Sequence, residues 1–83
     1  MAEEKPIGKV IHYYDKISVA IVKLDKKLSI GTMVKFVKGD NVFEQRVESM
    51  EVEHGKVTEA KKGDEIGIKV DQTTKVGTLL FVV

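Results

Sequence analysis

The chain has 83 residues, with 14 basic and 13 acidic side chains, so its net charge of +1 provides no whole-molecule field for nucleic acid or membrane. It has no cysteine, which excludes disulfides, thiolate metal sites and cysteine nucleophiles. An apolar fraction of 42% predicts one folded domain, residues 7–83, after a flexible N-terminal tail, residues 1–6. The first residues are polar and acidic and no apolar run approaches membrane length, so we expect a cytoplasmic protein without membrane contact.

Six segments predict β-strands, because they are rich in β-branched and aromatic residues and are separated by Gly, Asp and Asn. They are residues 7–14, 17–24, 33–38, 42–53, 65–70 and 78–83. The first two flank Asp15-Lys16 and predict a hairpin, and Leu28 and Ile30 are expected to pack on one end of the sheet. No segment has a convincing helical period, although residues 57–62 could form one short helical turn. The pattern predicts an all-β fold, a six-stranded antiparallel β-barrel.

The longest predicted strand, residues 42–53, changes its apolar phase along its length. Phe43 and Val47 share one face by period two, whereas Met50 falls on the other face. A shift of one residue indicates a β-bulge or bend, which we place near Glu48-Ser49.

Two glycines have structural interpretations that need no family comparison. Gly63-Asp64 predicts a tight turn, because Gly takes positive φ readily and Asp can bond its own backbone. Gly67 lies between two isoleucines that are expected to point inward, which indicates a close backbone approach or a bend in the sheet.

Four short motifs, in order along the chain, resemble the second domain of translational GTPases, the β-barrel behind the G domain of elongation factor Tu. They are Gly8-x-Val10, Leu28-x-x-Gly31, Val47-x-x-Met50-Glu51-Val52 and Ala60-x-x-Gly63-Asp64-x-x-Gly67-Ile68. The chain is also similar to the barrel at the C-terminus of collagenase-like peptidases, through the run at residues 12–17, and to small stand-alone elongation-factor-like proteins. It has no G-x-x-x-x-G-K-[ST] phosphate loop, so we expect no nucleotide binding.

The resemblance to elongation factor Tu implies a binding site for RNA. In that family a glutamate and a basic residue three positions on help to hold the aminoacyl end of transfer RNA, and the matching positions here are Glu51 and His54. The resemblance therefore implies a non-catalytic, translation-associated module whose partner is tRNA or another RNA. In the alternative interpretation, Glu51 and Glu53 are solvated side chains that alternate with the apolar residues of a strand.

Adjacent tyrosines offer a secondary contact for a partner. Tyr13 and Tyr14 must face opposite sides of a strand, so one of them is expected to be exposed. Together with Phe43 and nearby basic residues they could form a strip for single-stranded nucleic acid; alternatively Phe43 is core and the lysines protect edge strands. The basic residues are Lys9, Lys16, Lys35, Lys38 and Arg46.

The second hypothesis for the function is a protein-interaction subunit that docks onto a separate peptidase-like enzyme.

No motif predicts catalysis. The two histidines, His12 and His54, lack ligand spacing, so we expect no metal site and no cofactor. The serines lack the strained elbow and adjacent base of a nucleophile. We therefore expect a protein that is not an enzyme.

Overall fold

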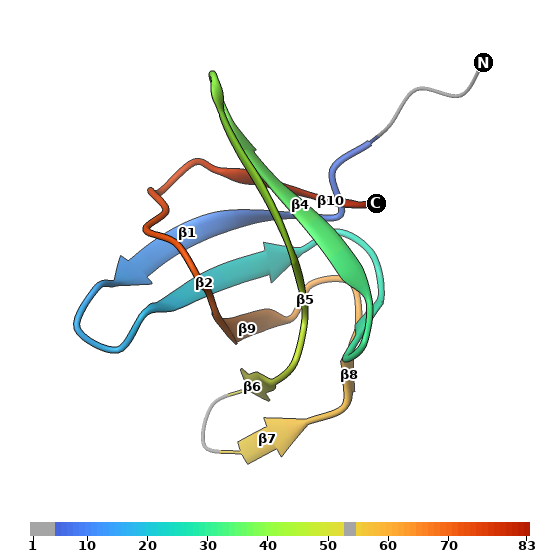
Figure 1. Cartoon of the computed structure of the whole chain (residues 1–83). Coiled ribbons are helices and arrows are strands. Elements are labelled where there is room, and N and C mark those ends of the chain that lie inside the picture. Colours follow the sequence, from blue (N-terminus) through green and yellow to red (C-terminus); the bar gives the residue numbers. More distant parts are fainter. Residues whose placement is uncertain (1–4, 53–54) are drawn as a thin grey trace.

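The computed structural model describes residues 5–52 and 55–83, and within them the chain forms β-strands and no helix (Figure 1). All-β architecture is therefore confirmed. The predicted tail falls mostly on residues 1–4, which lie outside the described residues. The strands are β1 (Gly8–Tyr14), β2 (Val19–Leu24), β3 (Leu28–Ser29), β4 (Met33–Lys38), β5 (Asn41–Arg46), β6 (Met50–Val52), β7 (Gly55–Val57), β8 (Glu59–Ala60), β9 (Glu65–Lys69) and β10 (Leu79–Val82).

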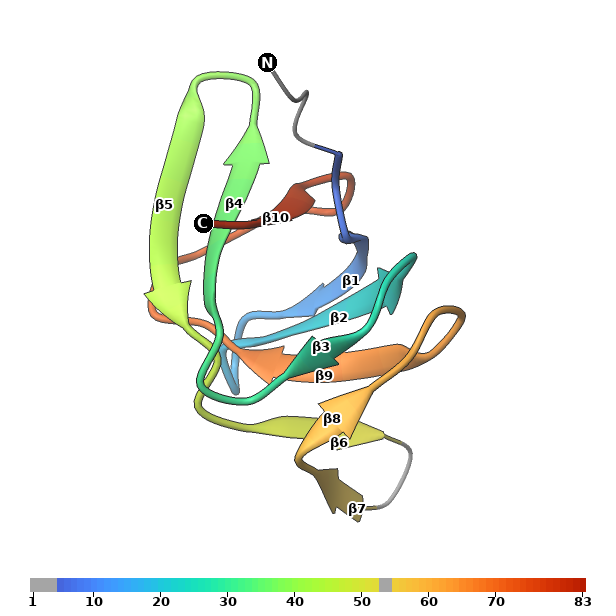
Figure 2. The same cartoon turned by 90° about the vertical axis from the view of Figure 1, so that its right-hand side faces the viewer.

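Eight of these strands form one antiparallel sheet in the order β5-β4-β10-β1-β2-β9-β6-β7, and β3 pairs with β8 in a separate ribbon (Figure 2). This differs from the predicted six-stranded antiparallel β-barrel. In the part of the chain that the structure describes, no ladder joins the terminal strands β5 and β7. The sheet is therefore open along this line.

The hydrophobic core fills the concave side of the curved sheet. Alternate residues of each main strand point inward, such as Val34 and Phe36 on β4 and Ile66 and Ile68 on β9, and all four are fully buried. The buried side chain of Gln45 links the terminal strand β5 to the end of β9. Its Nε2 donates to the Lys69 carbonyl and its Oε1 accepts from the Asp71 N–H, each at 2.8 Å, so one side chain holds β5 against the chain at the end of β9.

The predicted long strand is broken where the apolar phase shifts. Residues 47–49 lie between β5 and β6, which confirms the bend expected near Glu48-Ser49. The Val47 N–H donates to the Thr32 carbonyl at 2.9 Å, and the Gly31 N–H donates to the Val47 carbonyl at 2.7 Å. These bonds hold the corner while Val47 is buried.

Two local expectations are wrong. Residues 57–62 form no helical turn, because Glu59 and Ala60 pair with β3. Leu28 is buried as expected, but Ile30 is 40% exposed.

A β-bulge in β1 was not predicted, and it decides which side chains face outward. Val10 pairs with Val22 and His12 pairs with Ile21, so Ile11 is an extra residue in the β1–β2 ladder. The bulge shifts the phase, and beyond it Tyr13 packs against the core while His12 and Tyr14 are exposed.

The turn at Gly63-Asp64 has the geometry that its residues favour. Gly63 has φ +91°, and the Asp64 carboxylate accepts a hydrogen bond of 2.9 Å from the Lys61 N–H. Backbone bonds from Gly63 and Asp64 to Leu24 attach this turn to the end of β2.

Candidate functional site

Strand register places a row of outward-facing residues across four strands. His12 of β1 lies opposite Ile21 of β2, Ile21 lies opposite Gly67 of β9, and Gly67 lies opposite Glu51 of β6. Because directly opposed residues point to the same face, all four positions face away from the core. The four strands are neighbours in the sheet, as Figure 1 shows.

This row is the centre of a hollow of about 870 Å³ on the convex side of the sheet, here called the outer groove. A second row, from Tyr14 to Val19 to Lys69, runs beside the first. The groove is lined by His12, Tyr14, Ile17, Val19, Ile21, Glu51, Val52, Gly63, Asp64, Glu65, Gly67 and Lys69.

Gly67 makes the floor of the outer groove. A Cβ added there would lie 3.2 Å from Val19 Cγ1 and 3.4 Å from Ile21 Cδ1, and 3.9 Å from the Glu51 carbonyl oxygen. Gly67 does not have positive φ, so its backbone conformation does not require glycine. Glycine here instead leaves room between the neighbouring side chains. The neighbouring side chains therefore border a depression that a larger residue would fill.

The wall of the groove on the β1–β2 side is aromatic and aliphatic. Tyr14 is 51% exposed and Ile17 is 61% exposed, and the rings of His12 and Tyr14 stack with centroids 6.3 Å apart. Large apolar side chains that surround a hollow, rather than standing singly, mark a surface that gains free energy when a partner covers it. The groove can therefore bind an apolar projection from another molecule.

The opposite rim is acidic. Glu51, Asp64 and Glu65 line it, and Lys69 is the one lysine among the described lining residues. Carboxylates repel the phosphates of a nucleic acid, whose binding depends on replacing counterions with lysine and arginine. The charge of the groove therefore favours a partner with basic side chains around an apolar centre.

The structure brings together two of the residues predicted as a site and separates the others. Glu51 and Tyr14 both line the outer groove, whereas Tyr13 points inward and packs against the core. His54 lies outside the described residues, and so does the proposed pairing of Glu51 with His54. The predicted basic and aromatic strip is not continuous with this groove, because Phe43 and Lys38 line a different hollow.

The sequence interpretation missed Ile17, Val19 and Ile21 as surface residues. The signal was present, because the predicted strand 17–24 is apolar on both faces: Ala20, Val22 and Leu24 fill one face and Val19 and Ile21 the other. A strand of an antiparallel sheet with one solvated face normally alternates apolar with polar residues. The outer face of this strand is therefore apolar as well, with Val19 and Ile21 half-buried there.

Within the described residues, no three His, Asp or Glu side chains are grouped closely enough to hold a metal ion. The same residues contain no helix that is long and apolar enough to span a membrane.

No profile of a known protein family matches the chain. An uncharacterized protease of Methanocaldococcus jannaschii is 34% identical over 77 residues, which make up 92% of this chain and 19% of that protein. The chain thus spans about a fifth of the length of this curated relative.

Two crystal structures from Geobacillus thermoleovorans are similar over almost the whole chain. The C-terminal domain of a U32 peptidase superposes with a TM-score of 0.88 at 20% identity, covering 96% of this chain and 92% of that one. This chain has the fold of that C-terminal domain. The selenomethionine variant of the same domain gives a TM-score of 0.86 at 20% identity, covering 93% of this chain and 98% of that one. The resemblance to the barrel of collagenase-like peptidases is supported, and that to translation factors is not.

Proposed function

We propose that this chain is a non-catalytic binding module that docks onto a peptidase-like enzyme through the outer groove. The observation that carries the proposal is the groove itself, with exposed Tyr14 and Ile17 around a floor opened by Gly67. The fold supports the choice of partner, because its likeness is to a domain appended to a peptidase and to part of an uncharacterized protease.

Charge supports a protein partner over RNA. The predicted RNA contact, Glu51, lies in a groove with two further carboxylates, Asp64 and Glu65, which oppose phosphate binding. Neither the translation-associated role nor the six-stranded barrel of translation factors is supported by the comparisons and the strand order, so neither is part of the proposal.

The groove also indicates what the partner presents. An aliphatic or aromatic side chain of the partner would lie above Gly67, which has no side chain of its own, and would contact Val19 and Ile21. Lysine or arginine beside that side chain would face Glu51 and Glu65. The contact would thus combine an apolar anchor with a charged rim, the usual anatomy of a transient interface.

The proposal is tested by binding in trans. The M. jannaschii protease is prepared without the segment that matches this chain, and its affinity for this chain is measured by calorimetry at low and high salt. We expect binding in the micromolar range that weakens only a few-fold between 50 mM and 500 mM salt, because apolar contacts are screened far less than phosphate contacts.

Two serine substitutions give a matched comparison. Ile17 lines the outer groove, and Ile17→Ser should weaken binding at least about tenfold. The reason is that an anchor residue contributes more than about 1.4 kcal/mol to the free energy of binding. Ile30→Ser makes the same change at an exposed isoleucine outside the groove lining and should leave the affinity unchanged. No binding to the truncated protease, or equal effects of the two substitutions, would contradict the proposal.

A further inference from the structure

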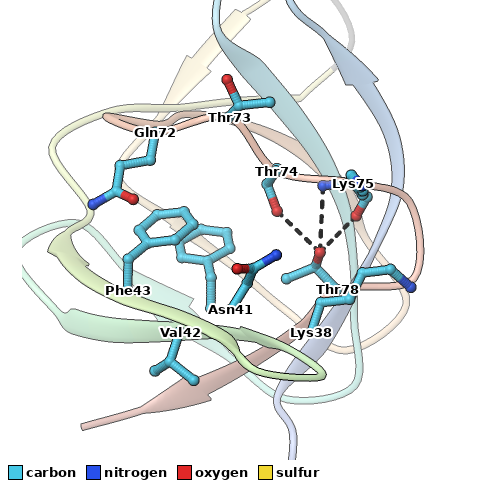
Figure 3. Close-up of a pocket in the computed structure, with 10 residues that line it drawn as sticks. Lys38, Asn41, Val42, Phe43, Gln72, Thr73, Thr74, Lys75 and Thr78 are labelled. Carbon is cyan, nitrogen blue, oxygen red and sulfur yellow. Dashed lines mark hydrogen bonds between the residues drawn. The ribbon is translucent and has the colours of Figure 1, made fainter.

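A second hollow, here called the β5 cleft, lies between the β4–β5 hairpin and the loop of residues 71–78 (Figure 3). It encloses about 290 Å³, close to the lower end of the range for small-ligand sites. One wall comes from Lys38 and residues 41–43, and the other comes from residues 72–75 and Thr78. It shares no lining residue with the outer groove.

One end of the β5 cleft is aromatic. Phe43 stacks on Phe36 with ring centroids 4.7 Å apart and an interplanar angle of 6°. Phe36 is fully buried, so the half-buried ring of Phe43 is the one that a ligand can touch. A ring that is fixed from behind by a second ring offers a rigid apolar surface at small entropic cost.

The other end of the cleft is polar, and its groups are held in place. Thr74 Oγ1 donates to Thr78 Oγ1 at 3.0 Å, and Thr78 Oγ1 in turn donates to the Lys75 carbonyl at 2.6 Å. Both threonines are buried, so this network fixes the loop that forms the wall. Figure 3 shows Asn41 between the phenylalanine rings and Thr78, with its side-chain amide in the cleft.

The rim of the β5 cleft is positively charged. Lys38 and Lys75 are among its lining residues, and no aspartate or glutamate is among them within the described chain. Lys38 extends along the rim toward the 75–78 turn, as Figure 3 shows, where its Nζ would lie 3.1 Å from a Cβ added to Gly77. The charge is thus opposite to that of the outer groove, and it favours an anionic group at the polar end.

We infer that the β5 cleft binds the C-terminal residue of a peptide, with an apolar or aromatic side chain against Phe43 and the terminal carboxylate near Lys38 and Lys75. The cleft has room for about one residue of this kind. β5 is a terminal strand of the sheet, paired with β4 alone among the described strands, so its outer edge has backbone groups for an extended peptide. This combination of a carboxylate site, an apolar contact and a strand edge favours a peptide end over a free anion or a nucleotide. The inference does not depend on docking at the outer groove.

The test is a titration of the isotope-labelled chain followed by amide chemical shifts. The probe is an N-acetylated pentapeptide that ends in phenylalanine, offered with a free carboxylate and, separately, as the C-terminal amide. We expect the acid to shift amides of residues 41–43, 72–75 and 78 and to bind at least tenfold more tightly than the amide. Removing two exposed positive charges, with Lys38→Met and Lys75→Met together, should weaken the acid at least tenfold, whereas the control Lys62→Met should not.

Other outcomes would overturn the inference. Equal binding of the acid and amide peptides would show that the carboxylate is not recognised. If N-acetylphenylalanine binds as tightly as the pentapeptide, the cleft recognises a single amino acid and not a peptide. If adenosine monophosphate binds more tightly than the pentapeptide and shifts the same amides, the cleft is a nucleotide site. Shifts confined to amides of the outer groove, or no shift at millimolar peptide, would leave the β5 cleft without this ligand. Because the docking test uses a protein partner and Ile17→Ser, failure of one proposal is distinguishable from failure of the other.

Discussion

Replacing Gln45 with leucine removes the side chain that joins the terminal strand β5 to the end of β9. Leucine has a similar size, so the core keeps its packing while the Lys69 carbonyl and the Asp71 N–H each lose a bond of 2.8 Å. Both hydrogen bonds are part-buried, and losing each of them costs about 1–2 kcal/mol, so we expect the free energy of unfolding to fall by about 2–4 kcal/mol. That is a large part of the roughly 4–12 kcal/mol expected for a domain of this size.

Urea unfolding followed by circular dichroism measures this loss. With a slope of about 1 kcal/mol per molar urea, the midpoint should fall by about 2–4 M. Gln72→Leu makes the same change at an exposed glutamine and should shift the midpoint by less than about 0.5 M. If the two variants unfold at the same urea concentration, the Gln45 side chain does not hold β5 against the end of β9.

Gln45→Glu adds a pH signature to the same position. The introduced carboxyl would be buried beside the Lys69 carbonyl, which raises its pKa in the folded state above the unfolded value of about 4.3. Relative to the unsubstituted chain at each pH, the loss of stability should therefore be greatest above the raised pKa and should shrink as pH falls through it. A loss that is independent of pH would show that the carboxyl reaches water.

Three further substitutions, one of them with a matched control, test the close contacts and the turn. An added Cβ at Gly8 would lie 2.7 Å from a methyl of the core, so Gly8→Ala should cost about 1–3 kcal/mol in urea unfolding, whereas Gly55→Ala meets nothing within 4 Å and should be nearly neutral. Gly67→Val would fill the floor of the outer groove beside Val19 and should reduce binding of the truncated protease at least about tenfold while the chain stays folded. Asp64→Ala removes an exposed hydrogen bond of 2.9 Å in the turn and should cost about 0.5–1.5 kcal/mol by thermal unfolding.

The main strands were predictable because their side chains alternate over five or more residues. The inward positions Ile66, Ile68 and Val70 follow from period two, and all three are buried. The break after β5 was also predictable, because the apolar phase changes between Val47 and Met50. Each of these signals is local to one strand.

The features that shape the outer groove depend on pairing between strands. The bulge at Ile11 leaves no mark in the sequence, because Val10, Ile11 and Tyr13 make both phases of the strand apolar. The two-residue strands β3 and β8 are too short to show a period, so their ribbon was missed. Whether the sheet closes is decided by the distance between its terminal strands, which no local pattern reports.

The candidate site was predicted in part. Tyr14 and Glu51 were named from the sequence, and both line the outer groove. The choice between Tyr13 and Tyr14 required the bulge, which turns Tyr14 outward and leaves it 51% exposed. The sequence did not predict the β5 cleft, because its two walls are separated by more than 25 residues of chain between Phe43 and Gln72.

The most direct test of the central proposal is a methyl cross-saturation measurement on the labelled chain in the presence of the truncated protease. Ile17, Val19 and Ile21 report on the outer groove, Ile30 reports on an exposed position outside it, and the fully buried Ile66 reports on the core. Docking through the outer groove predicts that the first three methyl signals lose intensity while those of Ile30 and Ile66 do not. Docking through the outer groove would be contradicted if only the Ile30 methyl lost intensity. It would also be contradicted if no methyl lost intensity when the truncated protease is present at saturating concentration.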